Sequence, residues 1–222
     1  MKSIRIYPVM LGLLSLLFIP TGCEQEDILT LEDFPEIKGN EGNEPGNEFI
    51  VEPDNGIDRV NSLTNAIKEH GDGTYILRRG GIYYFEGKNA IQNNVIIKSE
   101  EAEEGNLPQI QPIADANGAV GNNMINIEGN ITLEKVYINA IDAATGKVPD
   151  RVLVVDAPSL TLTLKDCFVD NCKQTLFRLN TANNKVIIDN STIRNTANPT
   201  SPDNGRIVDT RGNNQESIII NN

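Results

Sequence analysis

The chain has 222 residues, of which 31 are acidic and 19 are basic, so its net charge is −12 at pH 7. A surface this acidic argues against nucleic-acid binding and against a polybasic membrane patch, and it makes binding of acidic polysaccharides depend on calcium or a local basic patch. His70 is the one histidine and there are three cysteines. A zinc site of the Cys/His type is therefore excluded, and we expect no cofactor.

Residues 1–22 have the character of a secretory signal peptide. Two basic residues precede an apolar run from Val9 to Ile19 that is too short to cross a bilayer as a mature helix. The small residues directly before Cys23 resemble a bacterial lipobox, in which the cysteine is acylated and becomes the new N-terminus. Several buried acyl chains, at about 0.8 kcal/mol per CH₂, would anchor the protein without a spanning segment. The alternative, an ordinary signal peptide with a chance cysteine, explains less well why Cys23 ends the apolar run.

Residues 23–56 form an acidic segment, with eleven acidic residues and one basic residue among Gly, Pro and Asn. This composition buries too little apolar surface to offset the entropy of ordering, so we expect a flexible tether. Glu24, Glu26 and Asp27, close behind the predicted lipid-bearing cysteine, resemble the signal that sends Bacteroidota-type lipoproteins to the outer face of the outer membrane. Loss of residues 1–22 would leave 17 basic against 31 acidic residues, a net charge of −14.

The remaining residues, 57–222, form a domain of ordinary size. A short helix that ends near Gly71 is predicted because one of its faces would be formed by Ile57, Val60, Leu63, Thr64 and Ile67. Residues 73–100 then predict a strand, a Gly-Gly turn and further strand. The end of a sheet exposes an edge, so a helix that covers this edge has a physical purpose.

Three segments of this domain repeat one another without gaps: ITLEKVYINA at 131–140, LTLKDCFVDN at 162–171 and VIIDNSTIRN at 186–195. A further copy begins at Ile218, and VIIKSE at 95–100 is a weaker earlier copy. In each copy an alternating apolar stretch, two polar residues and a second alternating trio predict strand, bend, strand, bend. Asn suits the bends because it tolerates left-handed backbone angles. Repetition at these intervals predicts a parallel β-helix.

The N-terminal part of the domain resembles the cap of right-handed β-helices in the pectate lyase superfamily, through the helix, the strand GDGTYIL (71–77) and the turn GGIYY (80–84). The coils with LKDCFVDN and IDNSTIRN are similar to those of that superfamily. The layout over about 60–222 resembles more closely the pectate-lyase-fold lipoproteins related to chondroitinase B-like lyases. The resemblance implies an all-β, right-handed single-stranded parallel β-helix with a short N-terminal capping helix, on an outer-membrane lipoprotein that accompanies glycan-use systems.

An aromatic pair is the first candidate site. Equal positions in successive coils form columns about 4.8 Å apart, and the inward assignment of Ile138 and Val169 turns Tyr137 and Phe168 outward. Two stacked aromatic rings on an outer face would form a platform for a sugar ring. The alternative, which we favour, is that a loop at 141–150 or 172–176 covers them, because exposed aromatic patches are uncommon unless they are used.

The next outward column holds Asn139, Asp170 and Arg194. A uronic-acid lyase of this fold needs an Arg or Lys base, and it commonly uses Ca²⁺ on clustered carboxylates, so Arg194 and Asp170 are the weak catalytic candidates. The alternative, which we favour, is an ion pair between coils of little energetic value. The column Glu134, Lys165, Asp189 alternates in sign and predicts ion pairs of the same kind. No column contains three carboxylates, so no metal site is assigned.

Three hypotheses follow for function. The first is a surface lipoprotein that binds polysaccharide or helps process it, beside a partner protein that cleaves the glycan. The second is a polysaccharide lyase or hydrolase that acts on uronic-acid glycans. The third is a non-catalytic N-terminal part of a longer β-helix protein, because IIINN at 218–222 stops where earlier copies continue to a second strand.

Overall fold

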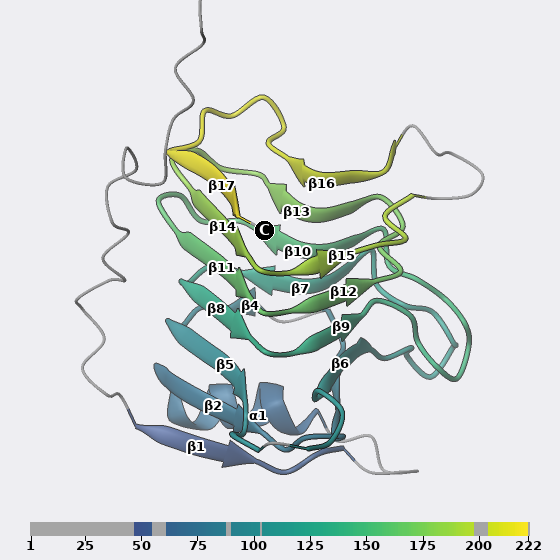
Figure 1. Cartoon of the computed structure of the whole chain (residues 1–222). Helices are drawn as coiled ribbons and strands as arrows, with labels where there is room; N and C mark the ends of the chain where they lie inside the picture. Colours follow the sequence, from purple (N-terminus) through teal and green to yellow (C-terminus); the bar gives the residue numbers. More distant parts are fainter. Residues whose placement is uncertain (1–46, 55–60, 88–89, 103, 198–203, 222) are drawn as a thin grey trace, which may run out of the picture. The chain divides into compact units, whose positions relative to one another are not determined.

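A computed structural model describes residues 47–54, 61–87, 90–102, 104–197 and 204–221. The predicted signal peptide, Cys23 and most of the predicted tether lie outside the described residues, as do the predicted helix positions Ile57 and Val60. The described part folds as a parallel β-solenoid, which confirms the fold class expected from the repeat (Figure 1). No helix in this part has the length and apolarity needed to cross a membrane.

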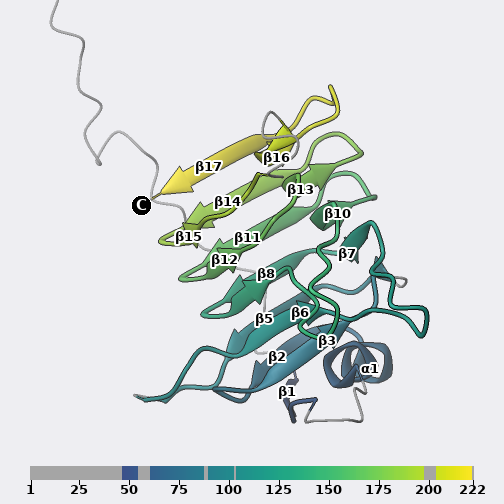
Figure 2. The same cartoon turned by 90° about the vertical axis from the view of Figure 1, so that its right-hand side faces the viewer.

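Three parallel sheets, here called A, B and C, run along the solenoid (Figures 1 and 2). Sheet A contains, in spatial order, β1 (Glu48–Val51), β2 (Gly73–Leu77), β5 (Val95–Ser99), β8 (Ile131–Glu134), β11 (Thr161–Lys165), β14 (Lys185–Asp189) and β17 (Ser217–Asn221). Sheet B contains β3 (Ile82–Phe85), β6 (Gln109–Pro112), β9 (Tyr137–Asn139), β12 (Phe168–Asp170) and β15 (Thr192–Ile193). Sheet C contains β4 (Ala90–Ile91), β7 (Asn123–Ile127), β10 (Arg151–Val155), β13 (Thr175–Leu179) and β16 (Arg206–Asp209).

The predicted repeat is confirmed residue by residue in sheet A. Leu162 pairs with Ile131 on one side and with Val186 on the other. The weaker copies also fall in the expected register, because Ile131 pairs with Val95 and Val186 with Ile218. Buried and half-buried positions alternate along these strands, as a sheet with one face on the core requires.

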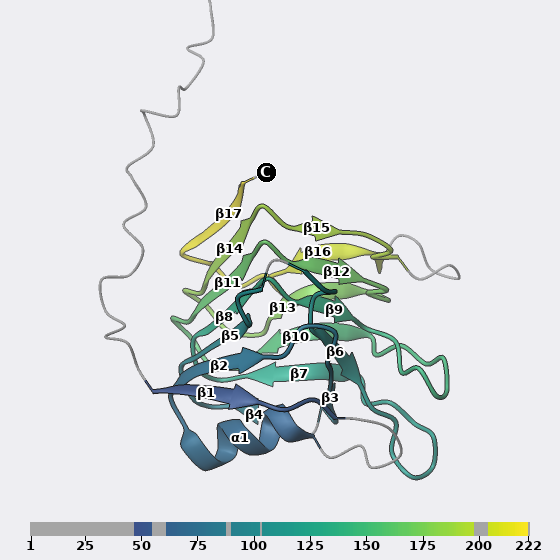
Figure 3. The same ribbon diagram turned by 60° about the horizontal axis from the view of Figure 1, so that its bottom comes forward.

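The helix α1 (Ser62–His70) lies at the N-terminal end of the solenoid, against β1, β2 and β3 (Figure 3). Leu63 and Ile67 are buried in the core, as the helical pattern predicts. Gly71 ends the helix with φ 78°, and its N–H donates to the Ile67 carbonyl at 2.9 Å.

Residues 48–51 belong to the solenoid, so the prediction of a flexible tether as far as residue 56 is wrong for this stretch. Strand β1 pairs in register with β2, from Glu48 against Thr74 to Val51 against Leu77. The ring of Phe49 stacks on His70, with centroids 4.2 Å apart. The prediction from acidic composition overlooked the short apolar run Phe49–Val51. The edge of β2 supplies hydrogen bonds to β1, and these offset the entropy lost when β1 becomes ordered.

Sheet C differs from the sequence prediction of two strands per coil. In its strands two adjacent residues both enter the core, such as Val152 with Leu153 and Leu176 with Phe177. The period-2 alternation that identifies a half-buried strand is therefore interrupted, and the connections between sheets B and C vary in length. These two features hid the third strand from the repeat.

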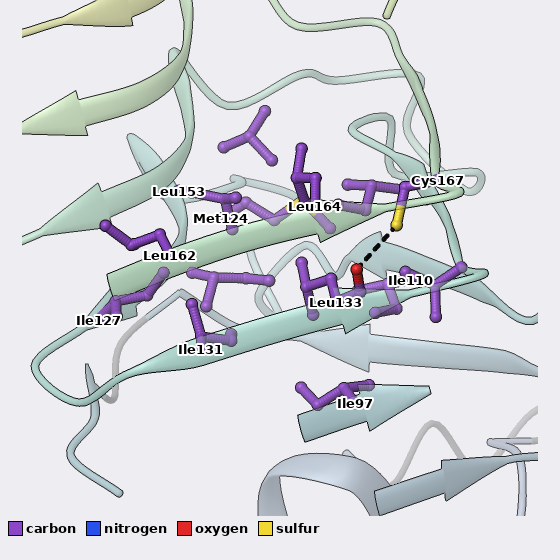
Figure 4. Close-up of a cluster of buried hydrophobic side chains, with 14 of the residues drawn as sticks. Ile97, Ile110, Met124, Ile127, Ile131, Leu133, Leu153, Leu162, Leu164 and Cys167 are labelled. Atoms are coloured by element: carbon purple, nitrogen blue, oxygen red, sulfur yellow. Dashed lines mark hydrogen bonds between the residues drawn. The ribbon is translucent and has the colours of Figure 1, made fainter. Parts of the chain in front are cut away.

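The core is a single column of hydrophobic side chains, most of them aliphatic, enclosed by the three sheets. Figure 4 shows members from each sheet, such as Ile97, Ile110 and Met124. The Cys167 thiol points into this column and donates to the Leu133 carbonyl at 3.2 Å. Cys167 and Cys172 are free and buried, and desolvation raises their pKa values to about 11 and about 12 respectively, so neither thiol is a nucleophile at neutral pH.

Candidate functional site

The outer face of sheet B brings the predicted aromatic pair together. Tyr137 and Phe168 are register partners on β9 and β12, and Ile138 and Val169 beside them are fully buried. The two rings meet edge to face, with centroids 5.3 Å apart and planes at 70°. Both side chains are half-buried, so the outward orientation expected from the sequence is observed.

The predicted ion pair lies directly beside these rings. Both Nε and Nη2 of Arg194 donate to Oδ2 of Asp170, at 3.0 and 2.8 Å. The Arg194 guanidinium carbon also lies 4.6 Å from the centroid of the Phe168 ring, in a cation–π contact. The Arg194 guanidinium therefore covers part of the Phe168 ring. We call Tyr137, Phe168, Asp170 and Arg194 the sheet B cluster.

Asp170 is held more tightly than an ion pair between exposed side chains would be. Asp170 is 4% exposed. Its Oδ1 accepts hydrogen bonds from Asn195 Nδ2 at 2.5 Å and from the Asn171 N–H at 2.9 Å. Burial alone would raise the pKa of this carboxyl. The hydrogen bonds from Arg194 and Asn195, with the positive charge of Arg194, outweigh burial and hold the pKa below its ordinary value. Asp170 thus remains an ionised anchor for the residues around it.

Neither Arg194 nor Tyr137 is prepared to accept a proton from a substrate at neutral pH. The hydrogen bond to Asp170 raises the pKa of the Arg194 guanidinium, whereas a lyase base must lose its proton. Burial, followed by the charge of Asp170, raises the pKa of the Tyr137 hydroxyl. The Arg194 side chain is 58% exposed, so it presents a fixed positive charge to solvent.

A groove with a volume of about 930 Å³ adjoins the sheet B cluster. Four stacked connections between sheets B and C line it: residues 119–122, 147–150, 171–173 and 195–197. In Figure 1 the connections from β6 to β7 and from β9 to β10 extend from the solenoid on the right. Asn171 and Asn195 belong both to the groove wall and to the hydrogen-bond shell of Asp170, so the groove and the cluster form one continuous surface.

The groove wall combines apolar and polar side chains. Val120, Val148 and Pro149 contribute apolar surface, and Lys173 pairs with Asp150 at 2.7 Å across the wall. Sequence reasoning left the position of Lys173 open and did not identify Asn171 and Asn195 as groove residues. The sequence did contain a signal, because these asparagines occupy equal positions one repeat apart. In the structure both have left-handed φ values, 64° and 53°.

The other predicted column, on the outer face of sheet A, is also formed. Lys165 is the register partner of Glu134 and Asp189, and its Nζ lies 3.0 Å from Glu134 Oε1. Both partners are partly exposed, so this pair adds little to stability. Within the described ranges, no three His, Cys, Asp or Glu side chains lie close enough to hold a metal ion.

Comparison with known proteins found no matching family model and no matching curated protein. The assignment of this chain to a β-solenoid therefore depends on its own repeat and strand register. The fold is compatible with a role in binding or processing polysaccharides.

Proposed function

We propose that the solenoid binds polysaccharide through the sheet B cluster and the adjoining groove, without cleaving it. One observation carries the proposal. The Phe168 ring, the Tyr137 ring in edge-to-face contact with it and the exposed Arg194 guanidinium lie beside a groove of about 930 Å³. The exposed edges of aromatic rings pack against the apolar face of a sugar ring, and planar polar groups bond its hydroxyls.

The groove supplies further hydrogen-bonding groups for sugar hydroxyls. Asn171 and Asn195 each use one amide N–H for an internal bond, to Asn139 Oδ1 and Asp170 Oδ1. Each amide retains a second N–H and its remaining acceptor capacity. Because the internal bonds fix these amides, binding a sugar would cost little side-chain entropy.

Non-catalytic binding agrees better with the electrostatics than a lyase reaction does. The raised pKa of Arg194 opposes its use as a base, and the bonds of Asp170 engage both of its carboxylate oxygens. The proposal includes an anchored surface location through lipid on Cys23 at the outer membrane, and a separate partner protein that degrades the glycan. The acidic segment behind Cys23 supports that location.

Affinity electrophoresis in gels that contain single polysaccharides tests the binding proposal. We expect the wild-type protein to be retarded by at least one glycan, and Phe168→Ala to bind about tenfold more weakly, since about 1.4 kcal/mol corresponds to tenfold. Thr192→Ala is the matched control, because Thr192 pairs with Phe168 in the same outward column and has no ring. Equal retardation of wild type and Phe168→Ala would contradict a binding role for the aromatic pair, provided that thermal melts show both proteins to be folded.

The lyase alternative has its own assay. Incubation with uronic-acid polymers and Ca²⁺ is followed by the ultraviolet absorbance of the unsaturated product. We expect a flat trace. A rising trace that disappears in Arg194→Gln would establish a lyase and overturn the non-catalytic proposal.

A further inference from the structure

A group of arginines lies on the outer side of sheet C and in the turn that follows its last strand. Arg151 is on β10, Arg178 on β13 and Arg206 on β16, and Arg211 follows β16 in the next turn. Thr175 of β13 is the register partner of both Arg151 and Arg206, so three consecutive coils contribute to the group. We call these four residues the arginine patch.

Among the described residues the patch contains little negative charge, although the whole chain has a net charge of −12. Asp209 is the carboxylate that pairs with it, and its Oδ2 lies 3.6 Å from Arg178 Nη1 and 3.8 Å from Arg206 Nη1. These distances are long for charge-assisted hydrogen bonds. Two neighbouring carboxylates have other partners: Asp150 pairs with Lys173, and Asp156 accepts from Asn180.

The arginines repel one another across the coils. Burial lowers the pKa of Arg178 first, and the positive charges of Arg151, Arg211 and Arg206 lower it further against the opposing effect of Asp209. An arginine keeps its proton in proteins, so this repulsion persists at neutral pH. An anion placed among these side chains would relieve it.

The internal hydrogen bonds of the patch leave donors free. Arg151 Nη1 donates to Asn123 Oδ1 at 3.2 Å, while its buried Nε has no acceptor. Arg178 Nε donates to Asn180 Oδ1 at 3.1 Å, which orients the guanidinium without neutralising it. The arrangement resembles a preorganised set of oxyanion donors more than a set of structural ion pairs.

We propose that the arginine patch is a second binding site, which takes the carboxylate or sulfate groups of an acidic glycan that crosses the coils of sheet C. Three neighbouring strands span about 10 Å, so the ligand carries two or more anionic groups within that length. This site lies on another sheet and does not depend on the proposed sheet B function.

The test compares two variants with the same change in net charge. Arg206→Gln/Arg211→Gln removes two exposed cations of the patch, and Lys98→Gln/Lys165→Gln removes two cations from sheet A. Binding to heparin, polygalacturonate and neutral dextran is measured by biolayer interferometry at several salt concentrations. We expect the arginine variant to bind an acidic glycan at least tenfold more weakly, with a shallower salt dependence, and the lysine variant to stay within about twofold of wild type.

Other outcomes would overturn this proposal. They are equal losses in the two variants, binding of inorganic sulfate without either acidic polymer, or DNA bound as tightly as the glycans. Phe168→Ala separates the two sites, because the salt dependence of acidic-glycan binding, which the patch provides, should remain in this variant. If Phe168→Ala abolishes that binding while the arginine variant keeps it, the anionic groups bind at sheet B instead. Thermal melts confirm that each variant is folded.

Discussion

At the scale of single residues, Asp170 organises the candidate site. Its buried carboxylate joins Arg194 and Asn195, from the next coil, to the backbone of Asn171 in its own coil. Arg194 in turn is held over the Phe168 ring. Asp170, which the sequence placed in a surface ion pair, therefore fixes the geometry of the aromatic surface and of one groove wall.

Replacement of Asp170 by Asn should destabilise the fold and weaken the organisation of the site. The variant loses a buried carboxylate that accepts several hydrogen bonds, so we expect its free energy of unfolding to be lower by about 1–3 kcal/mol at pH 7. Since the folded pKa lies below the ordinary 3.8, this stabilisation is present above that value and is lost as the pH falls through the folded pKa. Urea unfolding at pH 7 and near pH 3 checks both statements, with Asp189→Asn as the control.

The contrary result is equally specific. An Asp170→Asn deficit that stays constant down to pH 3 would show that shape, rather than charge, is what the site loses. A larger effect of Asp189→Asn would place the important carboxylate on sheet A.

At the scale of elements, the turns between sheets A and B share one backbone conformation. Lys135, Asp166 and Asn190 occupy the same place in successive coils, with φ values of 52°, 52° and 43°. Asn190 Nδ2 donates to Asp166 Oδ1 at 2.5 Å, so the side chains stack along the solenoid as the repeat predicts. Asp and Asn tolerate this left-handed region, whereas a lysine there pays a steric cost.

Lys135→Asn should therefore stabilise the solenoid. We expect the free energy of unfolding to rise by about 0.5–1 kcal/mol, because Asn adopts the left-handed conformation more readily than Lys. Chemical denaturation measures the change. Lys185→Asn, at the start of β14, is the matched control and should be neutral or destabilising, since Asn is disfavoured in strands. A gain in the control as large as that in Lys135→Asn would rule out the turn as its cause.

At the scale of the whole molecule, each coil is covered by its neighbours, and β17 is the last strand of sheet A in the described residues. Ile218 and Ile220 of β17 are in register with the buried Val186 and Ile188. They are nevertheless 41% and 54% exposed, so the described part of sheet A ends on a strand with exposed apolar side chains. An open strand edge that carries apolar side chains favours association between molecules.

Ile220→Lys should reduce self-association of this 222-residue chain with little effect on its stability. An exposed side chain contributes little burial, so the free energy of unfolding should change by less than about 0.5 kcal/mol. Sedimentation velocity over a range of concentrations measures association. Ser217→Lys, on the same strand, controls for the added charge. A wild-type chain that remains monomeric at the highest concentration would contradict the prediction.

Much of the fold was predictable because the signal is local and repeated. The alternation in ITLE, LTLK and VIID identifies the inward face of sheet A, and stacking places equal positions side by side. The same reasoning correctly turned Tyr137 and Phe168 outward and brought Asp170 next to Arg194. It failed at β1, where acidic composition outweighed a short apolar run, and at sheet C, where adjacent inward residues such as Val152 and Leu153 interrupt the alternation.

The sequence by itself determined the coil, its register and the direction of each repeated side chain, because these depend on a period of two residues and on stacking of equal positions. Only the tertiary structure decided which connecting residues meet. The links between sheets B and C differ in length from coil to coil, so spacing along the chain does not bring residues 119–122 and 147–150 together or form the groove. The arginine patch likewise exists only because hydrogen-bonded register aligns β10, β13 and β16.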